Sequence, residues 1–296
     1  MSASSPSPSI KALLDHGAKR LQTAGIEPAR REVEWILSHV TGATRLEFMM
    51  RGDRPVPAQE VALFESLLER RLASEPLQYL TGEAGFFGHI FRGTPAVLIP
   101  LPETEQLVEW ALERIGEMNE VRVLDLGTGS GCIPISIQLA RPGVRCTGLD
   151  VDESALVVAR GNAEALGANV RWIEADMLTA DLPALVSDPV HLLLSNPPYI
   201  ADLERDTLQP EVVDHEPHLA LFAGEDPLLF YRRLVSVAPS LLREGGWIGM
   251  EVHADHGQEV LALLDDAGWQ ESSIAKDLAG KDRLVTGRWN PAEATP

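Results

Sequence analysis

The chain is poor in lysine and cysteine, and it lacks any long apolar run. Its 296 residues contain four lysines and two cysteines, and aromatic residues make up only 5%. No stretch approaches the roughly 18 consecutive apolar residues of a membrane span, so we expect no membrane association. Cys132 and Cys146 match no zinc or redox spacing. They are expected to be buried thiols of a protein in the reducing cytoplasm.

The formal net charge of −19 is strongly acidic. A protein that grips nucleic acid needs clustered basic residues to displace counterions from phosphates, so we expect no direct nucleic-acid substrate. The acidity instead favours a partner with a basic surface. An alternative is adaptation to a saline cytoplasm, because the only lysines are Lys11, Lys19, Lys276 and Lys281.

Apolar residues recur at helical spacing in three early segments. The segments are 10–24, which stops at Gly25, 33–40, which stops at Gly42, and 61–72. They predict a small helical domain over 10–76, with a role in substrate recognition, after a Ser/Pro-rich disordered tail over 1–9. The Met49-Met50 pair is expected to be ordinary core rather than a partner surface.

The period changes after this region. Aromatic and β-branched residues punctuated by glycine run from Tyr79 to Ile99 and predict a β-hairpin linker over 77–101. A helix is expected over 103–118, and strands are expected at 121–125, 145–150, 170–175, 190–195 and 247–252. This alternation predicts an α/β fold over 102–290, a doubly wound and mostly parallel sheet whose ligands gather at the strand ends. Residues 291–296 are expected to form a tail.

A glycine-rich turn follows the first predicted strand and opens a helix. Its sequence is Asp125-Leu-Gly127-Thr128-Gly129-Ser130-Gly131. The NAD pattern G-x-G-x-x-G fails, because Cys132 stands where the last glycine is required. Glycines at alternate positions behind an acidic residue are instead typical of S-adenosylmethionine enzymes. We expect the turn to hold that cofactor and Asp125 to meet its methionine end.

Two further acids end the next two strands. Asp150 is placed to take a ribose diol, as acids at this position do in doubly wound folds. Asp176 is placed to accept from an adenine amino group, while Met177 covers the ring. For each acid alone, a helix cap or turn is an equally good interpretation. Together with the glycine turn they favour a cofactor site.

The segment Ser195-Asn196-Pro197-Pro198-Tyr199 follows the fourth strand. Pro197 restricts Asn196 to extended backbone, which makes the loop stiff. The Asn196 side-chain oxygen and a nearby backbone carbonyl can each accept one hydrogen of a planar NH2 group, and Tyr199 can pack against that group. We therefore predict methylation of an amide or exocyclic amino nitrogen, with Asn196, Pro197 and Tyr199 as catalytic residues and 196–199 as the substrate site.

The two motifs resemble those of class I S-adenosylmethionine-dependent methyltransferases with an Asn-Pro-Pro-Tyr loop. More narrowly, the chain resembles the peptide chain release factor N5-glutamine methyltransferases from about Glu75 to Arg288. The segments that carry this resemblance are Glu75-Pro-Leu-Gln-Tyr-Leu-Thr-Gly82, Ile99-Pro-Leu-Pro-Glu-Thr-Glu105, Glu216-Pro217 with Ala220-Leu-Phe222, and Asp277-Leu-Ala-Gly-Lys-Asp-Arg283.

This resemblance implies methylation of the glutamine in the Gly-Gly-Gln motif of class I release factors, with S-adenosylhomocysteine as product. By the same resemblance, 127–131, Asp150, Met177 and Asn196 hold the cofactor, and we expect a monomer. The chain departs from the family at Leu101, where arginine is usual, at Met177, where an aromatic residue is common, and at Pro227, where glycine is usual.

Other functions remain open at this point. One is glutamine methylation of a large-subunit ribosomal protein, and another is N6-adenine methylation of nucleic acid on a flipped base. A third is a binding protein that retains the fold without turnover. The His253-Ala-Asp255-His256 cluster has no standard metal-ligand spacing, so no metal is expected. Glu251 is expected to support the site from below.

Overall fold

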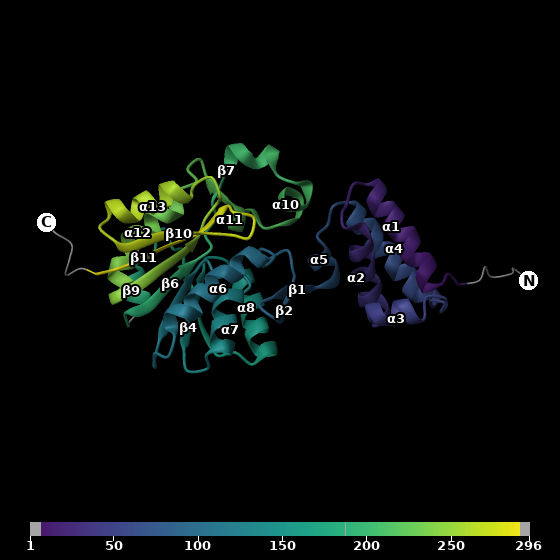
Figure 1. The fold of residues 1–296 in the computed structure, drawn as a ribbon, viewed down its shortest axis with the longest axis horizontal. Coiled ribbons are helices and arrows are strands. Elements are labelled where there is room, and N and C mark those ends of the chain that lie inside the picture. The colour runs from purple at the N-terminus through teal and green to yellow at the C-terminus, as the bar shows by residue number, and fades with distance from the viewer. Residues whose placement is uncertain (1–6, 187, 291–296) are drawn as a thin grey trace, which may run out of the picture. The chain divides into compact units, whose positions relative to one another are not determined.

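The computed structural model describes residues 7–186 and 188–290 (Figure 1). Two compact units make up the chain: Met1–Glu83 with Gln209–His215, and Ala84–Leu208 with Glu216–Pro296. The predicted tail over 291–296 and most of the predicted N-terminal tail lie outside the described residues. Ser9, however, is not tail, since its side chain accepts from the Ala12 N–H and caps the first helix.

The first unit is helical, as its apolar spacing predicts. Its helices are α1 (Ile10–Thr23), α2 (Ala29–Thr41), α3 (Arg45–Met50), α4 (Ala58–Leu72), α5 (Leu77–Thr81) and α10 (Pro210–His215). Leu14, Val33 and Phe64 belong to its buried core. Gly17 lets the first two helices approach closely, because an added Cβ would lie 2.9 Å from Val33 Cγ1.

The prediction that Met49 and Met50 belong to the core is wrong. They are 80% and 74% exposed. The short helix α3 buries only Phe48, and its last two residues, Met49 and Met50, point to solvent.

Helix α10 joins the first unit although the surrounding chain belongs to the second. The link is Arg71, whose side chain is only 4% exposed and pairs with Glu32 at 2.5 Å and Glu211 at 2.8 Å. His215 adds a contact of 3.3 Å between its Nε2 and the Ala73 carbonyl. The predicted division assigned this segment to the larger domain.

The predicted linker is only partly a hairpin. Its strands are β1 (Glu83–Phe86) and β2 (His89–Arg92), whereas the residues of α5 are helical. Pro76 precedes that helix and Gly82 ends it in the left-handed conformation, which is a start and stop pattern for a helix. The Phe87 N–H of the hairpin donates to Glu105 at 2.7 Å.

The second unit is built on a seven-stranded sheet of order β10-β11-β9-β6-β3-β4-β5. The strands are β3 (Arg122–Leu126), β4 (Arg145–Asp150), β5 (Val170–Glu174), β6 (Val190–Ser195), β9 (Leu242–Glu251), β10 (Gln270–Lys276) and β11 (Asp282–Arg288). The strands from β9 to β5 in this order pair in parallel, and β10 and β11 are antiparallel. The predicted α/β class with a mostly parallel sheet is confirmed.

Helices cover both faces of this sheet (Figure 1). The second unit contains the helices α6 (Pro102–Ile115), α7 (Cys132–Ala140), α8 (Glu153–Leu166), α9 (Leu182–Leu185), α11 (His218–Leu221), α12 (Leu229–Leu241) and α13 (Gly257–Asp266). It also contains a 3-10 helix η1 at Asp202–Thr207 and a small pair of strands, β7 (Ile200–Ala201) and β8 (Phe222–Gly224). Among the described residues, no helix has the length and apolar character that crossing a membrane requires.

Residues of one strand alternate between the two faces. Leu124 and Leu126 of β3 pack with residues of α12 and α13. Val123 of the same strand packs with residues of α6 and α7. Asp125 therefore points to the α6–α7 face.

Substitution of Gly148 by alanine is expected to destabilise the second unit by about 1–3 kcal/mol. An added Cβ at this position in β4 would lie 2.5 Å from the Trp172 ring and 2.8 Å from Thr128 Oγ1. Gly143→Ala is the matched control, because its Cβ would meet nothing within 4 Å. Urea unfolding of both variants measures the difference, and equal midpoints would contradict the tight packing at Gly148.

Candidate active site

The glycine turn lies between β3 and α7. Gly127, Gly129 and Gly131 all have positive φ, at 75°, 52° and 77°, a conformation that side chains other than glycine rarely adopt. The N–H groups of Gly127 and Thr128 both donate to the Leu149 carbonyl, at 2.8 and 2.9 Å. The turn is therefore fixed against the end of β4.

Asp150 is the residue that locks this turn. One of its carboxylate oxygens accepts from the Gly129 N–H at 2.8 Å, and the other accepts from the Asp152 N–H at 3.1 Å. Burial raises its pKa, which these backbone donors oppose. The carboxylate stays at the cavity wall, with lone pairs left for a hydroxyl donor.

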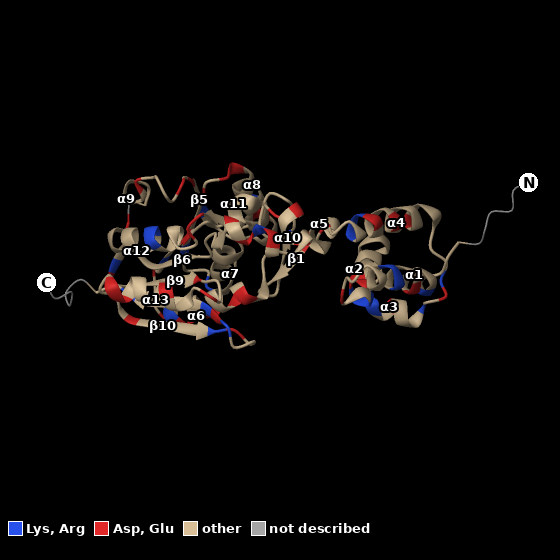
Figure 2. Cartoon of the chain, turned by 90° about the horizontal axis from the view of Figure 1, so that it is seen from above, with Lys and Arg blue, Asp and Glu red and all other residues tan. Residues whose placement is uncertain are grey.

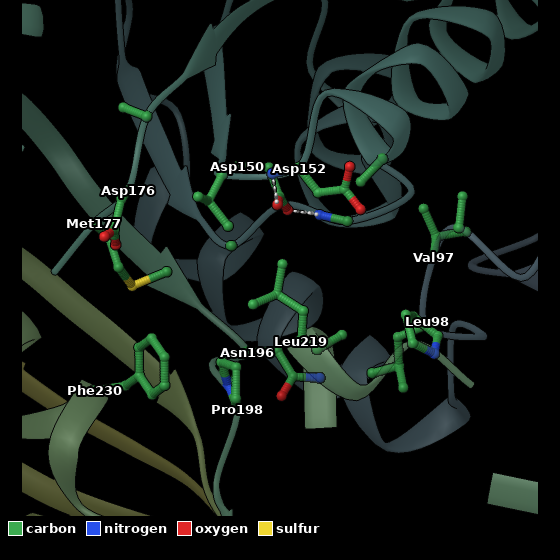
Figure 3. A pocket seen from close by; sticks show the side chains of 18 of the residues that line it. Val97, Leu98, Asp150, Asp152, Asp176, Met177, Asn196, Pro198, Leu219 and Phe230 are labelled. Carbon is green, nitrogen blue, oxygen red and sulfur yellow. Dashed lines mark hydrogen bonds between the residues drawn. The ribbon is translucent and has the colours of Figure 1, made fainter. Parts of the chain in front are cut away.

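Asp176 and Met177 follow β5 and lie on the side of the cavity away from Val97 and Leu98 (Figure 3). The Asp176 carboxylate accepts from the Leu178 N–H at 2.8 Å and from the Thr179 hydroxyl at 2.9 Å. Asp176 therefore acts as a turn residue, as the alternative interpretation has it, and it also lines the cavity. The Met177 methyl group lies against Gly127, where an added Cβ would be 3.1 Å away.

The Asn-Pro-Pro-Tyr loop begins where β6 ends beside β3. The Ser195 hydroxyl donates to the Leu126 carbonyl at 2.6 Å. The Asn196 amide donates from Nδ2 to the Thr104 hydroxyl oxygen at 3.3 Å. Pro197 and Pro198 are buried. Tyr199 packs against His253, with ring centroids 5.7 Å apart, and burial raises its pKa.

One cavity connects these elements (Figure 3). Of the predicted site residues it is lined by Gly127, Gly129, Asp150, Asp176, Met177, Asn196 and Pro198. The predicted residues outside its lining are Asp125, Thr128, Ser130, Gly131, Pro197 and Tyr199. The glycine turn and the Asn-Pro-Pro loop therefore share one space, although Gly127 and Asn196 are 69 positions apart in sequence.

The charge of the cavity has one sign. Asp150, Asp152 and Asp176 line it, and its lining in the described part of the chain includes no lysine, arginine or histidine. Such a wall suits a ligand that carries positive charge and hydroxyl donors, and it opposes a pyrophosphate. Asp and Glu are also spread over many other elements of both units (Figure 2).

Several lining residues were missed by the sequence analysis. Phe230 of α12 faces Met177 across the cavity edge, and Val97 and Leu98 lie on the opposite side (Figure 3). Leu219 of α11 is a fourth. No strand end or motif marks these residues, so only the tertiary structure identifies them. Phe230 supplies an aromatic ring beside the position where the family commonly has one.

Asp125 does not reach the cavity. Its side chain is fully buried on the α6–α7 face, and neither carboxylate oxygen has a hydrogen-bond partner among the described residues. Burial raises its pKa to about 7, opposed by the Thr128 hydroxyl and reinforced by the charge of Asp150. Its predicted contact with the methionine end stays a prediction.

The motif residues outside the cavity have structural partners. Thr104 contacts Asn196, and Glu105 accepts from the hairpin. Arg283 of β11 pairs with Asp277 at 3.2 Å. Leu101 precedes α6 and is 42% exposed. No group of three or more potential metal ligands occurs among residues 7–186 and 188–290.

Known families match both units. Residues 12–82 match the family described as "PrmC N-terminal domain". Residues 105–219 match the family described as "Methyltransferase small domain". A release factor glutamine methyltransferase of Chlorobaculum tepidum is 42% identical over 87% of this chain and 90% of its own length. One of Geobacter sulfurreducens is 38% identical over 94% of this chain and 96% of its own length.

Solved structures share the fold at low identity. A methyltransferase from Pyrococcus furiosus has a TM-score of 0.54 and 18% identity, covering 75% of this chain and 99% of its own. The hMettl16 catalytic domain, solved in complex with MAT2A 3'UTR hairpin 6, has a TM-score of 0.55 and 17% identity. The match covers 81% of this chain and 84% of that domain's chain. At this identity the likeness establishes the fold alone.

Substitution of Asp125 by asparagine is expected to make the protein more stable at pH 8 than the parent. An aspartate in the unfolded chain titrates near 3.8, whereas the pKa of Asp125 is about 7. The folded state thus binds the proton more tightly, and its stability falls as pH rises from about 4 to 7. The cost above pH 7 is at most about 4 kcal/mol.

Urea unfolding without added ligand, at pH 5 and pH 8.5, measures this difference. The advantage of Asp125→Asn should shrink toward pH 4, because the parent aspartate is then neutral in both states. A stability difference that does not change with pH would mean that Asp125 ionises normally.

Proposed function

The chain belongs to the release factor glutamine methyltransferase family, and on that premise we propose that it transfers a methyl group to the side-chain amide nitrogen of a release-factor glutamine. The glutamine is that of the Gly-Gly-Gln motif in class I release factors. The methyl donor is S-adenosylmethionine, the cofactor that methyltransferases of this kind generally use, and S-adenosylhomocysteine is the second product.

The observation that carries this proposal is the shared cavity. It brings the glycine turn of β3 and the Asn-Pro-Pro loop of β6 to one space. A transferred methyl must pass directly between donor and acceptor, so the two binding elements have to face the same volume. Asn196 lines this shared volume.

The cofactor end is assigned to the glycine turn and the acids around it. Asp150 would accept from the ribose hydroxyls, and Asp176 from the adenine amino group, while Met177 and Phe230 cover the ring. The three carboxylates of the wall favour the positive charge of a sulfonium and an ammonium group. The turn has no cation for a pyrophosphate, which agrees with a donor that lacks one.

The amide end is assigned to Asn196, Pro197, Pro198 and Tyr199. With its Nδ2 committed to Thr104, Asn196 presents its side-chain oxygen as an acceptor for one hydrogen of the substrate NH2. The backbone carbonyl of Pro197 would accept the other hydrogen. Tyr199 would limit the space beside the amide plane, and it stays neutral because burial raises its pKa.

A cofactor held by the glycine turn, Asp150 and Asp176 would supply a methyl group on a positively charged sulfur, and transfer of that group would break its bond to sulfur as its bond to the amide nitrogen forms. The amide nitrogen then carries a positive charge and releases one proton to solvent. Because an amide lone pair is delocalised, the two acceptors must hold the nitrogen in line and polarise its N–H bonds. No metal is required for this displacement.

Incubation with S-adenosylmethionine should add one methyl group to an unmethylated class I release factor. Intact-mass spectrometry detects the addition, and peptide mapping should place it on the Gly-Gly-Gln glutamine. Asn196→Ala should lower the rate by about 100-fold or more, because it removes an acceptor that fixes the nitrogen.

Asn169→Ala is the matched control, since Asn169 is an exposed residue directly before β5 and the variant should keep the parent rate. A release factor that gains no methyl group, with S-adenosylhomocysteine shown to bind, would overturn the proposed substrate. A large-subunit ribosomal protein and then nucleic acid would be the next substrates to assay.

A further inference from the structure

Glu251 is a buried carboxylate for which the proposed mechanism gives no role. It ends β9, it is 1% exposed, and neither of its oxygens completes a hydrogen bond among the described residues. A buried carboxylate without hydrogen bonds destabilises the folded state unless another interaction compensates for its burial. Its position next to the Asn-Pro-Pro loop follows from the sheet, because Met250 pairs with Ser195.

The side chain of Glu251 points toward the start of α6. Gly249, two residues earlier, faces this helix, since a Cβ there would lie 3.0 Å from Leu107 and 2.7 Å from Trp110. Residues two apart on a strand share a face. Thr104, in the first turn of α6, is 3% exposed and lies between this face and Asn196.

Two donors face the carboxylate of Glu251. The Thr104 hydroxyl and the Asn196 amide both oppose the rise in its pKa that burial causes, and the charge of Arg283 does the same. Thr104 also accepts from Asn196 at 3.3 Å. A hydroxyl that accepts one hydrogen bond still has its own hydrogen to donate, so Thr104 can link the amide to the carboxylate.

The chemistry of these groups fixes the direction of the hydrogen bonds that run from Asn196 through Thr104 to Glu251. An ionised carboxylate only accepts, so it draws the Thr104 hydrogen toward itself and leaves the Thr104 oxygen to accept from Asn196. The Asn196 NH2 end is then held away from the substrate, and its oxygen end faces the cavity. If the Asn196 amide were turned the other way, its NH2 group would face the substrate NH2 group, and two donors cannot form a hydrogen bond with each other.

Resting on the proposed function, we propose that Glu251 is a positioning residue that acts through Thr104 to fix the orientation of the Asn196 side-chain amide. Glu251 does not touch the substrate or the cofactor. Its effect is expected in turnover and not in cofactor affinity.

The pH dependence of turnover follows from ionisation of Glu251, whose pKa burial raises to about 7. Protonation converts the carboxylate into a donor, which competes for the Thr104 oxygen. The groups that face Glu251 or perturb it are Glu103 and Thr104 of α6, Asn196 and Tyr199 of the loop, Arg283 of β11, Tyr231 of α12 and Cys132 of α7. Tyr199, Tyr231 and Cys132 stay protonated up to pH 9, because burial raises their pKa values.

The test uses the full chain with an unmethylated class I release factor. Values of kcat and KM are measured from pH 6 to 9, and S-adenosylhomocysteine binding is measured by calorimetry. Thr104→Val should lower kcat about 10- to 100-fold with unchanged cofactor binding, and Thr104→Ser should restore most of it. For the parent protein, kcat should rise through pH 7, and Glu251→Gln should lower kcat and remove this rise.

Two controls separate this effect from others. Glu244→Gln alters an exposed glutamate at the far end of β9, and the variant should behave as the parent does. Asp125→Asn should retain the rise through pH 7, although the pKa of Asp125 is also about 7.

Full turnover by Thr104→Val, or a parent-like pH profile for Glu251→Gln, would overturn the positioning role while the proposed function stands. If the parent protein leaves the release factor unmodified, the proposed function fails, and this inference fails with it. Should Glu251→Gln not fold, the pair of Thr104 variants decides the outcome alone.

Discussion

The parallel pairing of β3 with β6 is the constraint on which the rest of the site depends. Val123 pairs with Leu192 and Asp125 with Leu194, so the two chain segments leave the sheet side by side and in the same direction. The Ser195 hydroxyl on the Leu126 carbonyl fixes that exit. Parallel pairing therefore brings two motifs that are distant in sequence to one edge of the sheet.

Much of this architecture was predictable from sequence. The strands 145–150 and 190–195 have the predicted bounds, and each ends in a polar residue, Asp150 and Ser195. The acids and glycines that follow such runs mark the edge where ligands bind. By contrast, β10 and β11, which pair antiparallel, were not predicted as strands, although Asp282 and Arg283 of β11 belong to a segment that carries the family resemblance. Helix α5 depends on the local effect of Pro76 and Gly82.

The part of the site that sequence did not predict consists of residues whose role depends on facing direction. Asp125 belongs to the glycine motif, but its side chain is fully buried and is not part of the cavity lining, so its predicted contact with the cofactor stays a prediction. Phe230, Val97 and Leu98 line the cavity, although no motif marks Phe230 and the pattern of the linker that holds Val97 and Leu98 predicts only a hairpin. Thr104 belongs to a motif used to name a family, yet its contact with Asn196 spans 92 positions. The periodicity of apolar residues in a sequence identifies helices and strands, but it seldom shows which residues contact one another in the folded protein.

Helix α10 limits how this chain can be taken apart. Because Arg71 holds Glu211 in the first unit, the backbone passes between the two units three times, near residues 83, 208 and 215. A protein whose units met at one linker could exchange its front unit by a single recombination event. In this chain such an exchange would replace Arg71 but keep Glu211, because Glu211 lies in a later part of the sequence. The ion pair therefore ties sequence changes in the early part of the chain to sequence changes in α10.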